Sequence, residues 1–195
     1  MQTSAPVPPA PHDPPRHEDS ALVRAARTDA TAFGHLYDRY LDRVYAYLRA
    51  RTTTQEDAAD LAQQVFLQAL DALPRYQGQG AEFAGWLFRI ARNVATDFHR
   101  RRRPTVPWDF VLEALQPRTD LGVEAGLLRR EALAHLRTLF GRLDAETREL
   151  LVLRFAARLT VAESAAVVGK SEAATQKRLF RTIQTLKEQY DDDPR

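Results

Sequence analysis

Apolar residues recur every three or four positions along most of the chain, which is the spacing of amphipathic α-helices. Ser20 and Asp29 each stand where they can cap the start of such a pattern. The most regular pattern runs from Ala58 to Leu73 and stops at Pro74, because proline cannot continue a helix. No alternating apolar run or hairpin turn indicates a β-strand. The pattern therefore predicts an all-α protein.

The helical patterns fall into two blocks with a break between them. Residues 19–103 hold three or four helices, and residues 129–189 hold the rest. Residues 104–128 contain three prolines and two glycines with little periodicity, which is typical of a linker with at most a local helix near Val111–Leu115. We therefore expect two small helical domains joined by a flexible linker. The later patterns lie at Glu82–Arg103, Leu127–Phe140, Ala145–Ala157, Val161–Val168 and Glu172–Gln189.

Both ends of the chain differ in composition from the helical blocks. Six of the 11 prolines lie between Pro6 and Pro15 without apolar periodicity, so residues 1–18 are predicted to be a disordered tail. Residues 190–195 form a short acidic tail. The N-terminus lacks the features of a signal peptide, and no apolar run approaches the roughly 20 residues that cross a bilayer. We expect a cytoplasmic protein without direct membrane insertion.

A helix-turn-helix is predicted near the C-terminus. Thr160 and Glu163 form a capping box, and Gly169 suits a helix end. Ser171 can cap a second helix, so that a three-residue turn joins the two. A solvated basic helix that closes a bundle is the alternative. The caps on both sides of the turn and the almost uncharged first helix favour DNA recognition. The side chains predicted to contact phosphates or guanine edges are Lys177, Arg178 and Arg181.

Basic residues are concentrated in two places although the formal net charge is only +2. Six arginines stand against one acid, Asp97, between Arg89 and Arg103, and five basic residues stand against one acid between Lys170 and Lys187. The first stretch has few acids at the positions where helical ion pairs form, so its arginines are predicted to bind phosphate. Two basic stretches indicate two contacts with a polyanion.

Metal sites and enzymes have little support in the sequence. The chain has no cysteine, which excludes thiolate zinc modules and disulfides. The carboxylates Glu56, Asp57 and Asp60 motivate a metal-dependent nuclease as a weak alternative. Histidines have no ligand spacing, and no nucleophile is paired with a base. The histidines are His12, His17, His35, His99 and His135. We therefore expect no metal site, no cofactor and no enzymatic activity.

Three strings in the first block and one in the second carry a family resemblance. Ala32–Tyr40, Asp57–Leu67 and Trp86–Asn93 resemble the sigma-two domain of extracytoplasmic-function sigma factors, a group of the sigma-70 family. Leu143–Leu186 resembles the sigma-four domain. The resemblance covers about residues 20–103 and 129–188 in the order and spacing of the family. It implies a factor that gives RNA polymerase its promoter specificity.

The resemblance also implies the roles of particular residues. Sigma-two would dock on core RNA polymerase and open promoter DNA at the minus-ten element, and sigma-four would read the minus-thirty-five duplex. The polymerase-binding positions are Asp57, Asp60, Gln63 and Gln64. The minus-ten positions are Tyr76, in a loop that would hold an unstacked base, and Arg89, Arg92, Asn93, Thr96, Asp97, Arg100 and Arg101. The minus-thirty-five positions are Ser171, Glu172, Ala174, Thr175, Lys177, Arg178 and Arg181.

The chain departs from the family pattern at two places. Gln64 stands where a glutamate is usual, and Ala173, Ala174, Thr175 and Gln176 stand where glycine, threonine, valine and lysine are common, so base preference cannot be carried over. The expected partners are core RNA polymerase, promoter DNA and an anti-sigma factor. The runner-up function is a helix-turn-helix regulator that acts without replacing sigma. A second DNA-facing domain argues against it.

Overall fold

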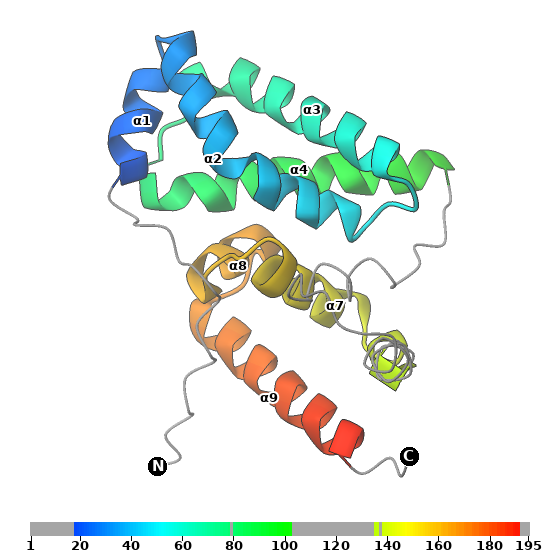
Figure 1. Cartoon of the computed structure of the whole chain (residues 1–195). Helices are drawn as coiled ribbons and strands as arrows, with labels where there is room; N and C mark the ends of the chain where they lie inside the picture. The colour runs from blue at the N-terminus through cyan, green and yellow to red at the C-terminus, as the bar shows by residue number, and fades with distance from the viewer. Residues whose placement is uncertain (1–17, 79, 103–134, 137, 192–195) are drawn as a thin grey trace, which may run out of the picture.

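The computed structural model describes residues 18–78, 80–102, 135–136 and 138–191, and every element in these ranges is helical (Figure 1). The predicted all-α class is therefore confirmed. Both predicted tails, apart from residues 18, 190 and 191, lie outside the described residues. The predicted linker and most of the helix at Leu127–Phe140 also lie outside them. None of the described helices is both long enough and apolar enough to cross a membrane.

Four α-helices form the first domain. They are α1 (Glu18–Ala26), α2 (Ala30–Arg49), α3 (Gln55–Ala72) and α4 (Gly80–Arg102), with a 3-10 turn at Leu73–Arg75. Asp29 caps α2 as predicted, because its carboxylate accepts a hydrogen bond from the amide of Thr31 at 2.8 Å. Ser20 was expected to cap the first helix. It lies inside α1 instead, because that helix already begins at Glu18.

The first domain packs around the apolar faces of α2, α3 and α4. Leu36, Val44 and Val65 are fully buried there. Aromatic pairs add edge-on contacts, such as Tyr40 with Phe83 at a centroid distance of 5.3 Å. These contacts fix the direction of α3 and α4, whose outer faces carry the candidate functional residues.

Besides the helical residues 135–136 and 138–141, three helices and a π-helical turn make up the described part of the second domain. They are α7 (Ala145–Leu151), the π-helix Val152–Ala156, α8 (Val161–Val168) and α9 (Glu172–Asp191). The single helix expected over Ala145–Ala157 therefore changes from α to π half-way. A π-turn takes in one extra residue, and the chain leaves it through Arg158 at a φ of +55°.

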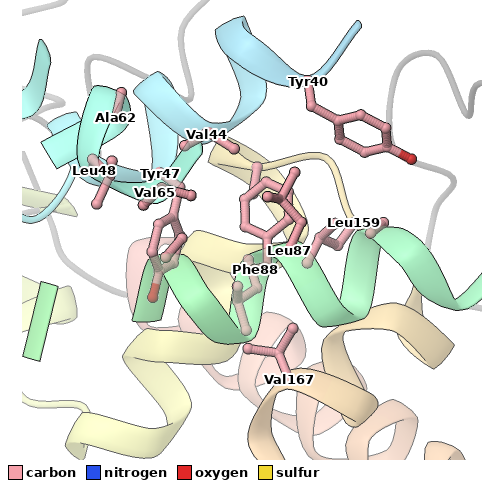
Figure 2. Packing of buried hydrophobic residues seen from close by; sticks show 14 of the residues in the cluster. Tyr40, Val44, Tyr47, Leu48, Ala62, Val65, Leu87, Phe88, Leu159 and Val167 are labelled. Carbon is pink, nitrogen blue, oxygen red and sulfur yellow. The ribbon is translucent and has the colours of Figure 1, made fainter. Parts of the chain in front are cut away.

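The two domains are in direct contact. Figure 1 shows α8 lying against α4, and the buried apolar residues of both domains form one continuous cluster. Figure 2 shows Val167 of α8 beside α4, and it belongs to the same buried cluster as Phe88 of α4 and Tyr47 of α2. Gly85 permits this approach, because a Cβ atom there would lie only 3.2 Å from the Cβ of Ala166.

Candidate functional site

The exposed face of α3 carries the predicted polymerase-binding residues. Asp60, Gln63 and Gln64 are exposed along it, and the two glutamines lie one helical turn after Asp60. Asp57 is half-buried, and its carboxylate accepts a hydrogen bond from the hydroxyl of Thr54, the cap of this helix, at 2.7 Å. Asp57 therefore has a structural role at the start of α3, whatever else it contacts.

Leu67 lies in the centre of the same face and was missed at the sequence level. Its side chain is 65% exposed, and Leu70 beside it is 39% exposed, the two exposed large apolar residues of the described chain. Four and seven positions separate Leu67 from Gln63 and Asp60, so the three share one stripe of the helix. An apolar residue within a polar stripe is the sequence signal that could have identified it. Leu67 and Leu70 thus form a small exposed apolar area beside the polar residues of α3.

The outer face of α4 carries the predicted minus-ten residues. The guanidinium of Arg100 pairs with Asp97 at 3.3 Å, and the hydroxyl of Thr96 donates to the carbonyl of Arg92 at 2.7 Å. The face presents cationic, amide and carboxylate groups together, which suits contacts with both phosphates and base edges. The exposed residues of this face are Arg89, Arg92, Asn93, Thr96, Asp97, Arg100 and Arg101.

Arg92 has partners that the sequence did not reveal. Its guanidinium donates to the carbonyl of Val167 at 3.4 Å and lies 3.9 Å from the carboxylate of Glu149. The prediction that this helix leaves its arginines unpaired is therefore wrong for Arg92. The reason is that its acidic partner comes from the other domain, outside the local spacing that the sequence argument considered.

Tyr76 is buried and does not lie open in a loop. Its side chain is 8% exposed, and its ring packs on Trp86 at 4.8 Å and on Phe83 at 6.1 Å. The 3-10 turn before it carries the chain back onto the core. The expectation that Tyr76 contacts an unstacked base is therefore corrected. The side chains at positions 79–81, which complete the predicted loop, are outside the described residues.

The helix-turn-helix has the predicted geometry. The capping box of Thr160 and Glu163 is present, and Gly169 adopts a φ of +71°, the left-handed conformation that favours glycine at a helix end. The hydroxyl of Ser171 accepts a hydrogen bond from the amide of Ala174 at 3.3 Å and so caps α9. The second helix is thus set at a fixed angle to α8.

Most of the predicted minus-thirty-five residues are accessible on α9, with two exceptions. Thr175 is 1% exposed because it lies on the apolar side of the helix, one turn before the buried Leu179, so its predicted contact with DNA is corrected. Arg178 is only partly exposed and is described next. The exposed positions are Ser171, Glu172, Ala174, Lys177 and Arg181.

Arg178 uses its guanidinium inside the protein. It pairs with Asp144 at 2.8 Å and Glu146 at 2.9 Å, and its Nε donates to the hydroxyl of Thr147 at 2.9 Å. Burial lowers the pKa of Arg178, but the two carboxylates more than offset this and raise it. Hydrogen bonds from Thr147, and then from Arg178, hold the pKa of Asp144 well below its usual range. Arg178 therefore fastens α9 to the start of α7.

Within the described ranges, no three histidine, aspartate or glutamate side chains are grouped so that they could hold a metal ion. Glu56, Asp57 and Asp60, which motivated the nuclease alternative, follow one another along the first turns of α3. The accessible features are thus an acidic and apolar face on α3 and two basic faces on α4 and α9.

Comparisons with known proteins agree with this arrangement. A family model described as Sigma-70 region 2 matches residues 36–105. The chain is 35% identical over 189 residues to the ECF RNA polymerase sigma factor BldN of Streptomyces coelicolor, covering 93% of this chain and 71% of that protein. It is 34% identical over 178 residues to the ECF RNA polymerase sigma factor ShbA of Streptomyces griseus, covering 86% and 92%.

A solved structure is similar over both domains. It is the structure of CnrH in complex with the cytosolic domain of CnrY, with a TM-score of 0.63, 28% identity, and coverage of 90% of this chain and 99% of that one. The sequence identity, the shared length and the helical architecture point the same way. The chain belongs to the extracytoplasmic-function group of the sigma-70 family of RNA polymerase sigma factors.

Proposed function

We propose that the chain acts in the cytoplasm as a transcription initiation factor that docks on core RNA polymerase through the exposed face of α3. Asp60, Gln63 and Gln64 line this face, and Leu67 gives it an apolar centre. Buried apolar contact supplies most of the free energy of association, whereas the acidic and amide groups around it set orientation. Such a face fits a basic helical surface on the polymerase.

Promoter recognition is divided between α4 and α9 in this proposal. The exposed side of α4 carries Asn93 and Asp97 one turn apart with arginines beside them, so the amide and carboxylate can meet base edges while the guanidiniums hold the backbone. The Watson–Crick edges of the bases are free only on melted DNA, and a helix that meets these edges would serve the minus-ten element. On α9, Lys177 and Arg181 are exposed and suit the major groove of the minus-thirty-five duplex.

One observation carries the proposal: the chain has two separate basic helices, one in each domain, together with an acidic and apolar face on α3. A helix-turn-helix regulator that acts without replacing sigma needs only the second domain. Structural neighbours occur in complexes, as with CnrH and the cytosolic domain of CnrY. We propose likewise that an anti-sigma factor binds this chain. No catalytic activity of its own is needed for any of these steps.

Transcription with purified core RNA polymerase tests the function. Genomic DNA fragments are transcribed with core enzyme alone and with core enzyme plus this chain, and the transcript starts are mapped. We expect new starts that share elements near positions minus ten and minus thirty-five. If the chain changes only the amount of transcripts from starts that another sigma factor already uses, the regulator alternative holds and the proposal is wrong.

A further inference from the structure

Arg178 lies at the edge of the surface with which α9 would meet DNA. Consecutive residues of an α-helix are rotated by about 100°, so Arg178 lies only about 60° around the helix from the exposed Arg181. Ala174, four positions before Arg178, is also exposed. The long side chain of an arginine at this position is able to reach a phosphate of a duplex that contacts these residues. Its contacts within the domain decide whether it does.

Two carboxylates hold that guanidinium on the side of α7. Asp144, the cap of α7, lies 2.8 Å from one terminal nitrogen of Arg178, and Glu146, in the first turn of α7, lies 2.9 Å from the other. The Nε of Arg178 donates to the hydroxyl of Thr147 at 2.9 Å. Several contacts on one guanidinium hold it more firmly than a single surface ion pair would. An arginine bound to phosphate needs the same nitrogens for the phosphate oxygens, so the two uses of Arg178 exclude one another.

The same contacts neutralise positive charge next to the recognition surface. Lys170, between α8 and α9, lies 3.6 Å from the second carboxylate oxygen of Glu146. Two acidic and two basic side chains therefore form a group without net charge. Among the described residues, Lys177 and Arg181 make no ion pair and keep their full charge for DNA. Affinity for DNA of any sequence grows with each phosphate that a cation neutralises, so the pairing of Arg178 lowers this affinity.

We propose that Asp144 and Glu146 are positioning residues that set the DNA specificity of the second domain, because they withhold Arg178 from phosphates and keep α9 at a fixed angle. The first effect lowers the affinity for DNA of any sequence. The second preserves the affinity for the minus-thirty-five element, since base contacts need a fixed orientation of α9 in the groove. The protein is then retained less on the large excess of non-promoter DNA. The inference rests on the proposed function, because it assumes that α9 reads duplex DNA.

Replacement of the two carboxylates by amides tests the proposal. Asp144→Asn with Glu146→Gln keeps the size of both side chains, and asparagine also caps helices well. Binding of the chain to duplex DNA without promoter sequence is measured by fluorescence anisotropy at several salt concentrations. We expect tighter binding than for the wild type, and a slope of log affinity against log salt that is steeper by about 0.9, the value for one more phosphate contact. The advantage of the variant should therefore shrink about 3.5-fold between 50 and 200 mM salt.

The gain in affinity should depend on Arg178. The same two substitutions in an Arg178→Ala background remove both negative charges but have no guanidinium to release, so we expect the steeper slope to be lost there. Glu188→Gln, at an exposed site elsewhere on α9, is the control for the loss of an acid. A gain of equal size without Arg178 would show that the carboxylates only repel DNA, and would overturn the proposal.

A purely structural role of the two carboxylates predicts the opposite sign, namely weaker binding after their replacement. Unchanged or lower affinity of the folded double variant, checked by circular dichroism, would therefore also overturn the proposal. Glu146→Gln alone leaves the cap of α7 intact and should change the affinity in the same direction as the double variant. It keeps the test decisive if the double variant does not fold.

Specificity itself is measured with the complex of core polymerase and the chain. Its affinity is compared for a promoter fragment and for the same fragment with a scrambled minus-thirty-five element. We expect the ratio of the two affinities to fall at least about threefold with Asp144→Asn and Glu146→Gln, because the scrambled fragment gains affinity and the intact one does not. An unchanged ratio would refute the role in specificity. If the complex with the wild-type chain does not prefer promoter DNA at all, the proposed function fails, which is a separate outcome.

Discussion

Arg178 shows how a residue that looks like a DNA contact can act inside the protein. Three of its guanidinium nitrogens bind Asp144, Glu146 and Thr147 at distances below 3 Å. Lys177 and Arg181, one and three positions away, are exposed and remain accessible to phosphate. On α9, therefore, Arg178 holds the helix in place, whereas its basic neighbours Lys177 and Arg181 are available to DNA. Substitutions can separate these two roles.

The salt dependence of binding to duplex promoter DNA distinguishes these roles. Lys177→Ala and Arg181→Ala should each lower the slope of log affinity against log salt by about one, because each removes a phosphate contact. Arg178→Ala should leave the slope unchanged and instead lower the unfolding free energy by about 1 kcal/mol or less, given the partial exposure of its partners. Fluorescence anisotropy and urea unfolding measure the two quantities. A lowered slope for Arg178→Ala would show that it does contact phosphate.

Asp144 provides a pH-dependent prediction. Hydrogen bonds from Thr147 hold its pKa below the ordinary value of 3.8, so its contribution to stability is fully present above that value and is lost as the pH falls through the lowered pKa. Asp144→Asn should be less stable than wild type at neutral pH, and the gap should narrow below about pH 4. Thermal unfolding followed by circular dichroism checks this. Asp38→Asn, at an exposed site on α2, is the control and should show no such narrowing.

At the scale of single helices, α3 and α4 combine a buried face that builds the domain with an outer face available to partners. The outer face of α3 tolerates an exposed Leu67 that the fold itself does not need. On α4 the outer residues are polar and mutually bonded, as Arg100 is to Asp97. Changes on these faces should therefore affect partner binding more than stability.

Leu67→Asp should weaken co-purification with core polymerase about tenfold or more and leave the melting temperature nearly unchanged. The control is His35→Asp, which introduces an acidic side chain at an exposed site on α2. Asp60→Arg combined with Gln63→Ala should act like Leu67→Asp. Undiminished co-purification by both variants would show that polymerase binds another face.

Asn93→Ala should impair promoter opening more than initial binding, because its proposed partners, the Watson–Crick edges of the bases, become free only after the strands separate. We expect affinity for closed duplex within a few-fold of wild type and a loss of unpaired thymines in permanganate footprints. Gln184→Ala, an exposed amide near the end of α9, serves as the control. A normal open bubble with Asn93→Ala would remove Asn93 from the minus-ten contact.

At the scale of the whole molecule, the interface that joins the domains depends on one buried arginine of α2. Arg43→Ala would leave the carbonyls of Ala157 and Arg158 without its hydrogen bonds, at a cost of about 1–3 kcal/mol. We expect the urea midpoint of the full chain to fall accordingly, whereas Arg24→Ala on the surface of α1 should leave it unchanged. A midpoint unchanged by Arg43→Ala would mean that the domains do not pack in this way in solution.

The sequence predicted what depends on neighbours along the chain. Apolar periodicity located the helices, and local rules located the caps at Asp29, Thr160 and Gly169. The sequence did not predict the π-helical turn, because the residues Val152–Ala156 are of the types that an ordinary buried α-helix also contains.

The candidate site residues show the same difference between properties set by neighbours along the chain and properties set by distant contacts. Exposure of Asp60, Asn93 and Lys177 followed from helical faces. The burial of Tyr76 and the partners of Arg92 did not, because the contacts of Arg92 reach residues 57 and 75 positions away. Pairings over such separations have no local signal in a single sequence.

The shared position of Arg92 has a consequence for reading any affinity measurement. Its removal would delete a proposed DNA contact and, at the same time, its contacts with Glu149 and with the carbonyl of Val167 in the second domain. A lower affinity of Arg92→Ala for promoter DNA would therefore not by itself demonstrate a contact with DNA. A double-mutant cycle of Arg92→Ala with Glu149→Gln would separate the two effects, because Glu149 is buried between the domains.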